Sequence, residues 1–217
     1  MRRQAFVVGA AVVLSTIFLA ACGGESSSDS NEQSGSYAVK VTKAEFPPEQ
    51  QLGETALLRL GVRNTGHRTL PTLTVTMSVG GPEGRNSALP FGYRDPAAGI
   101  AQPDRPVWAL AAGYPKVNGS DEPGGGETAE AKTFAFGPLK PGATTEAVWK
   151  LSAVKAGSYK LFYEVGAGLT SETRAKAANG AEAGGSFAVK VSDVPPEVEV
   201  KDNGEVVEIG GKADSGK

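Results

Sequence analysis

The chain has 217 residues, of which 40% are hydrophobic and 7% aromatic, and it carries 22 Lys and Arg side chains against 24 Asp and Glu. This slightly acidic balance gives the phosphates of nucleic acids no electrostatic reason to bind, so a nucleic-acid partner is not expected. A single cysteine excludes a disulfide framework, and a single histidine excludes a site built from several imidazoles.

The first 21 residues are organised like an export signal. Arg2 and Arg3 are followed by an uncharged apolar run over residues 5–19. That run is shorter than the roughly 20 residues that a membrane-spanning helix needs, and it matches the apolar region of a secretory signal peptide. The two arginines also suggest a twin-arginine signal, but the strong apolar run favours general secretion.

The sequence Leu19-Ala20-Ala21-Cys22 comes next and resembles the lipobox of bacterial lipoproteins, which is an aliphatic residue, two small residues and a cysteine. The resemblance implies cleavage before Cys22, a diacylglycerol and palmitate-type chains on the new N-terminus, and a place at the extracytoplasmic face of the cell membrane. Two or three acyl chains anchor a protein firmly where one chain is marginal. The alternative is an ordinary cleaved signal beside a buried cysteine.

Residues 22–36 are expected to form a disordered tether, because no apolar side chain follows Cys22 in this stretch that could offset the entropy of ordering it. Flexible-coil scaling gives such a segment a span of about 20 Å. The folded part of the chain is therefore expected to hang close to the membrane.

Between residues 37 and 193, seven runs alternate apolar and polar side chains with the period of a half-buried strand. They cover residues 37–42, 56–63, 72–79, 134–136, 147–151, 159–165 and 187–192. The pattern predicts an all-β fold, an immunoglobulin-like antiparallel β-sandwich of about seven strands. Trp149 and Tyr163 are expected to point into its core. The one helix that the pattern suggests is short, over residues 171–178.

Several strand ends resemble those of CARDB-like modules, the cell-adhesion-related domains found in bacteria. Residues 58–66 read LRLGVRNTG and carry the V-x-N-x-G pattern of that family, and Leu139-Lys140-Pro141-Gly142 and Gly157-Ser158-Tyr159 resemble its L-x-P-G turn and G-x-Y strand start. The resemblance covers about residues 37–79 and 133–192 and implies an immunoglobulin-like fold without indicating a function. Independently of it, Asn64 and Gly66 tolerate left-handed conformations and Pro141-Gly142 suits a type II turn.

A long insert over residues 80–132 interrupts the pattern, and about a third of it is Gly and Pro. Three interpretations stand: a cover that folds its aromatic rings over one end of the sandwich, a partner-binding loop, or disorder. The candidate partner-binding residues are Tyr93, Arg94, Trp108 and Tyr114. Residues 107–110 are a candidate extra edge strand. Because loop length costs little, replacing residues 81–132 by a short linker is expected to leave the domain folded.

The end of the chain predicts a β-hairpin over residues 194–209 and a disordered tail over residues 210–217. The turn of the hairpin is Asn203-Gly204, which lies between two alternating apolar runs. An isolated hairpin is marginal in water, so this one is expected to lean on the sandwich or to fray.

Motifs of serine hydrolases, zinc proteases, thiol redox proteins and phosphate-binding loops are absent, so the chain is predicted not to be an enzyme and to use no cofactor. No metal site is expected, with a loose calcium site at Asp121, Glu122 and Glu127 as the alternative. His67 is interpreted as a solvated turn residue.

The expected function is that of a non-enzymatic binding, adhesion or envelope-scaffold module. Its expected partners are the membrane, through the N-terminal lipid, and an unknown protein or envelope polymer. The alternative is a small-ligand or metal-handling accessory lipoprotein of a transport system.

Overall fold

The structure is a computed structural model that describes residues 34–81, 84–88, 90–93, 106–120, 124–127, 132–170, 172–195, 197–204 and 206–208. Every regular element in these ranges is a β-strand, and none of them contains a helix long and apolar enough to cross a bilayer. The predicted signal peptide with Cys22, residues 22–33 of the predicted tether and the predicted tail over residues 210–217 lie outside the described residues.

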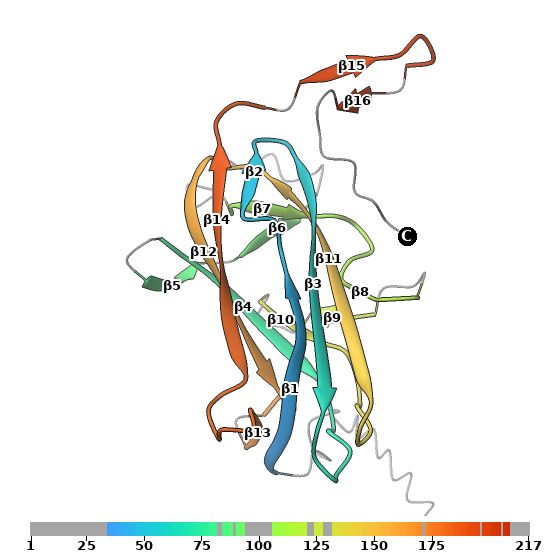
Figure 1. Ribbon diagram of the computed structural model, residues 1–217, viewed down its shortest axis with the longest axis vertical. Helices are drawn as coiled ribbons and strands as arrows, with labels where there is room; N and C mark the ends of the chain where they lie inside the picture. The colour runs from blue at the N-terminus through green and yellow to red at the C-terminus, as the bar shows by residue number, and fades with distance from the viewer. Residues whose placement is uncertain are drawn as a thin grey trace, which may run out of the picture.

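One sheet is built on three long strands, β1 (Gly35–Glu45), β3 (Thr55–Asn64) and β11 (Thr144–Ala153). Its order is β13-β1-β3-β11-β7-β6, and β8 also pairs with β11 (Figure 1). The shorter members are β13 (Thr173–Lys176), β7 (Trp108–Leu110), β6 (Phe91–Tyr93) and β8 (Lys116–Val117).

The other sheet is built on β4 (Thr74–Gly81), β12 (Gly157–Gly166) and β14 (Gly184–Ser192). Its order is β2-β14-β12-β4-β10-β9, and β5 also pairs with β4. The shorter members are β2 (Glu49–Gln51), β10 (Thr133–Ala135), β9 (Gly126–Glu127) and β5 (Gly84–Ala88).

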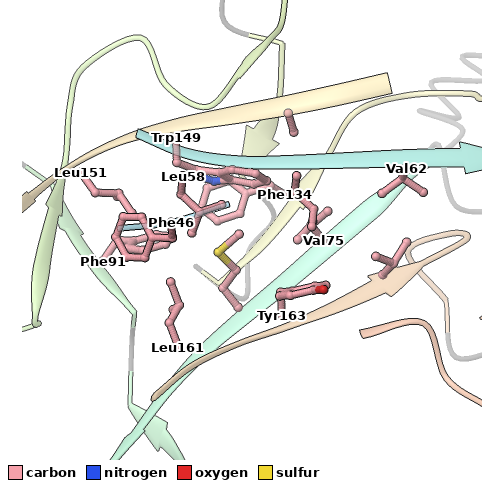
Figure 2. Packing of buried hydrophobic residues seen from close by; sticks show 14 of the residues in the cluster. Phe46, Leu58, Val62, Val75, Phe91, Phe134, Trp149, Leu151, Leu161 and Tyr163 are labelled. Atoms are coloured by element: carbon pink, nitrogen blue, oxygen red, sulfur yellow. The ribbon is translucent and has the colours of Figure 1, made fainter. Parts of the chain in front are cut away.

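The core lies between the two sheets and is formed by alternate residues of the long strands. In the first sheet, Leu58 of β3 is opposite Trp149 of β11, and both are fully buried. Met77 and Leu161 of the second sheet are fully buried as well, and Figure 2 shows how the side chains of the two sheets meet. Burying each such side chain contributes about 1.5–3 kcal/mol. The predicted all-β sandwich and the inward direction of Trp149 and Tyr163 are confirmed.

The structure differs from the prediction in strand direction and in one element. Three pairings are parallel (β1 with β13, β14 with β2, and β6 with β7), so both sheets are mixed. The helix predicted over residues 171–178 is wrong, because β13 occupies residues 173–176. Thr173 and Ala175 are buried on one face of this strand while its backbone pairs with residues 35–38 of β1. Long-range pairing has overridden the local helical preference.

The insert is part of both sheets. It contains β5 to β9, and the strand predicted over residues 107–110 is confirmed as β7. Its predicted edge position is wrong, because β7 lies between β11 and β6 and β6 is the edge of the sheet. Phe91 is 4% exposed, Trp108 0% and Leu110 2%. Figure 2 shows Phe91 among the core side chains of the two sheets. The insert therefore supplies a share of the hydrophobic core.

At one end of the sandwich, the side chain of Asn64 joins two loops. Its Nδ2 donates hydrogen bonds to the carbonyl oxygens of Arg68 (2.9 Å) and Leu139 (2.8 Å), and its Oδ1 accepts one from the backbone N–H of Gly66 (2.9 Å). Asn64 is a strand residue, so its importance comes from these side-chain bonds and not from a left-handed backbone. Gly142 does have the positive φ, 75°, that a type II turn requires.

The C-terminal hairpin is present, formed by β15 (Val198–Val200) and β16 (Val206–Glu208). It lies beyond one end of the sandwich (Figure 1). The side chain of Val200 is 64% exposed.

Candidate functional site

The candidate partner-binding residues of the insert do not form one described surface. Trp108 is fully buried, so its ring is not available to a partner. Tyr114 is half-buried against the core, with Nζ of Lys116 5.5 Å from its ring centroid. Tyr93 is the last residue of β6, where only the backbone is described, and Arg94 lies outside the described residues.

The suggested calcium site has no described counterpart. Asp121 and Glu122 lie outside the described residues, and Glu127 is part of β9. Within the described ranges, no three His, Cys, Asp or Glu side chains gather in a way that could hold a metal ion. His67 is exposed in the bend that follows β3, where the sequence places it.

An open groove of about 700 Å³ lies where β2 joins β14 and β12. Three short segments line it: the residues that lead into β2, the start of β12 and the second half of β14. Its apolar surface comes from the exposed Pro47, Pro48 and Ala188 and the half-buried Tyr159, above the buried Val189, and its polar rim from Glu49, Ser158, Lys160 and Lys190.

Trp108 supports the floor of this groove from below. Its ring lies 6.0 Å from that of Tyr159, edge to face, and 5.6 Å from that of Phe46. Its Nε1–H donates a 2.8 Å hydrogen bond to Oε1 of Gln50, a side chain that is itself buried, and Nε2 of Gln50 donates to the carbonyl oxygen of Pro47 (3.0 Å). Through this one buried indole, the insert therefore holds both the Tyr159 side and the Pro47 side of the groove in place.

Tyr159 is held in place by its hydroxyl group. The O–H donates a 2.7 Å hydrogen bond to the carbonyl oxygen of Ala156, and a Cβ on Gly157 would lie 2.7 Å from this hydroxyl oxygen. Gly157 also has a φ of 145°, which L side chains rarely adopt, so glycine is required there. Burial raises the pKa of the Tyr159 phenol above its ordinary value, so the hydroxyl remains a donor at neutral pH.

Two lysines form the positive side of the rim. The backbone N–H of Lys190 donates to the carbonyl oxygen of Pro48 (2.8 Å), which fixes the strand, while its side chain is exposed. Lys160 is exposed on β12, with its Nζ 5.8 Å from the ring centroid of Phe162. Neither ammonium group has an ion-pair partner among the described residues. An apolar floor beside two such cations suits an anionic group carried on an apolar chain.

Sequence reasoning missed this groove because three segments far apart in the chain build it. Each segment carried a part of the signal: Pro47-Pro48 breaks a strand pattern, and Lys160 and Lys190 occupy outward positions of two predicted strands. Only the register, in which Ser158 lies opposite Lys190 and Lys160 opposite Ala188, brings these positions together.

No protein-family model matches the chain, and no curated protein matches it. Among solved structures, a CARDB domain from Pyrococcus furiosus, crystallised in complex with di-metal ions, is similar with 11% identity and a TM-score of 0.38 over 73% of this chain and 93% of that one. A cohesin module of a Clostridium perfringens family 33 glycoside hydrolase is similar with 10% identity and a TM-score of 0.40 over 73% of this chain and 98% of that one.

Alpha-2-macroglobulin of Escherichia coli matches 74% of this chain with 17% identity and a TM-score of 0.38, over 7% of its own length. Similarities of this size carry no activity or partner across to this chain. The architecture is established by the strand pairing itself: the chain forms an all-β sandwich of two mixed sheets.

Proposed function

We propose that this chain is a lipid-anchored binding module of the cell envelope, held at the extracytoplasmic face of the membrane by Cys22 and without an enzymatic activity of its own. The observation that supports binding is the groove of β2, β12 and β14, with its two lysines beside an apolar floor. The two sheets bury their apolar faces against each other, so they act as a rigid support for this surface.

The ligand class that fits best is an extended polypeptide segment. β14 pairs with β12 along most of its length but with β2 only through residues 190–192, so the outer edge of residues 184–189 has no strand partner among the described residues. An open edge of this kind can accept an extended segment through main-chain hydrogen bonds. The lysines next to the edge would then select segments that carry acidic side chains.

Photo-crosslinking tests the groove directly. A photoreactive phenylalanine analogue placed at Ser158, which is exposed at the rim, is expected to capture a protein partner in intact cells. The same analogue at Lys150, which is exposed on the opposite sheet, is the matched control. Equal capture from both positions, or none from Ser158, would contradict a binding role for the groove.

The lipid anchor has its own test. Replacing Cys22 by serine removes the sulfur that the lipobox resemblance places under a diacylglycerol, so the variant is expected to leave the membrane fraction or to remain unprocessed. Fractionation and labelling with a fatty acid measure this. Label on the serine variant equal to that on the original chain would rule out the anchor while leaving the groove untouched.

A further inference from the structure

We propose that the groove takes up the acidic C-terminal hairpin of a second copy of this chain. The inference rests on the proposed function, since it names the partner of the same groove. It joins two features of the fold: an acidic hairpin with exposed valines, and a groove whose rim carries two lysines and one glutamate, Glu49.

The hairpin has a charge opposite to the net charge of the groove rim, where the two lysines outnumber Glu49. Residues 193–208 carry six acidic side chains and one lysine. Val194 and Val200 expose 62% and 64% of their surface. Because an isolated two-stranded hairpin is marginal in water, docking on a larger surface would stabilise it.

The groove offers the complementary surface. Lys160 and Lys190 lie beside the exposed apolar side chains of Pro47, Pro48 and Ala188. Alternating Val and Glu side chains, as in residues 197–200, present acidic groups on one face of a strand and apolar groups on the other. One face would meet the lysines while the other covers apolar surface, and the open edge of β14 lies next to both.

The arrangement favours a second copy over the chain's own hairpin. The hairpin lies beyond the end of the sandwich that carries it (Figure 1). The connector that follows β14 contains Pro195-Pro196, and consecutive prolines make a connector stiff and extended. Two copies that exchange hairpins would form a closed, two-fold symmetric pair in which each groove is filled once.

The oligomeric state tests this inference. Sedimentation of the full chain in mild detergent is expected to show a dimer that forms with rising concentration and weakens with salt. The double variant Lys160→Glu with Lys190→Glu is expected to associate at least about tenfold more weakly, because like charges would then face each other. Its matched control is Lys40→Glu with Lys150→Glu, which makes the same charge change at exposed positions of the other sheet.

A charge exchange separates specific docking from general repulsion. Glu197→Lys with Glu199→Lys is expected to weaken the dimer in the same way. Mixing this variant with the Lys160→Glu, Lys190→Glu chain is expected to restore a mixed dimer, since opposite charges then meet in both contacts: the Glu groove receives the Lys hairpin, and the unchanged groove receives the unchanged hairpin. Circular dichroism of each variant checks that the sandwich is still folded.

Three results would overturn the inference: a monomer at all concentrations, equal loss of association in the control, or no mixed dimer from the exchanged pair. A monomer whose groove still captures another envelope protein through the photoreactive group at Ser158 would overturn self-docking and leave the proposed function standing. A monomer without such capture would contradict both.

Discussion

Replacing Trp149 by alanine is expected to lower the free energy of unfolding by about 3–5 kcal/mol. Trp149 is fully buried in β11, at the centre of the core. Its ring lies edge to face with Phe134 (5.8 Å between centroids) and Phe136 (5.6 Å). The variant therefore loses the buried area of the indole, leaves a cavity, and loses two aromatic contacts of about 0.5–1.5 kcal/mol each, which are part of the total.

Thermal unfolding measures the effect. For a domain of this size, each kcal/mol corresponds to roughly 2–4 °C, so the melting temperature should fall by on the order of 10 °C. Trp149→Phe is the matched control, because it keeps an aromatic ring and removes an indole N–H that has no hydrogen-bond partner among the described residues. The loss of unfolding free energy for Trp149→Phe should be at most half of the loss for Trp149→Ala. An unchanged melting temperature of the alanine variant would contradict the packing described.

Replacing residues 81–132 by a short Gly/Ser linker is expected to unfold the domain. The sequence predicts the opposite, on the ground that the length of a loop costs little. The structure changes this expectation because Phe91, Trp108 and Leu110 of the insert are core residues. The loss of each of these large buried side chains costs about 2–5 kcal/mol. The three losses together are comparable to the whole free energy of unfolding of a typical domain, about 5–15 kcal/mol.

Proteolysis and circular dichroism of the purified variant test this result. Trp108→Ala alone should lower the free energy of unfolding by about 3–5 kcal/mol, a part of the loss expected for the linker variant. It should also leave Oε1 of the buried Gln50 without the hydrogen bond that it accepts from the indole N–H. The variant Tyr114→Ala is the control within the same insert, since that side chain is only half-buried and should cost clearly less. A linker variant that melts cooperatively near the original temperature would contradict the role given to the insert.

The long strands were predictable because their signal is local. In β3, Ala56, Leu58, Leu60 and Val62 alternate with less buried residues, and this period of two is readable without knowing the partner strand. β6 has three residues, too short for a period, and it was not predicted, because its pairing depends on β7, which itself pairs with β11. The helix predicted over residues 171–178 failed for the same reason, since β1 supplies the pairing.

The groove was not predictable, although several of its residues belong to strands that the sequence predicts. Tyr159 begins the alternating run over residues 159–165, whose pattern predicts an inward side chain, and the structure places it half-buried at the start of β12. Whether such a side chain is fully buried or lines a groove depends on which other residues cover it. Here Trp108 of the insert packs against one side of the Tyr159 ring, and the other side faces the groove. No pattern within one strand contains that information.

In both sheets, central strands pair with strands that lie far away in the sequence, so the chain cannot fold until those later strands have been synthesised. β3 pairs with β11, and β4 pairs with β12, across roughly 80–100 residues of intervening chain. Neither sheet gains its central strands before most of the chain has been synthesised, and such topologies fold in milliseconds to seconds. Late pairing of this kind is compatible with the export signal predicted at the N-terminus, because the central strands cannot pair until the C-terminal half of the chain has been made.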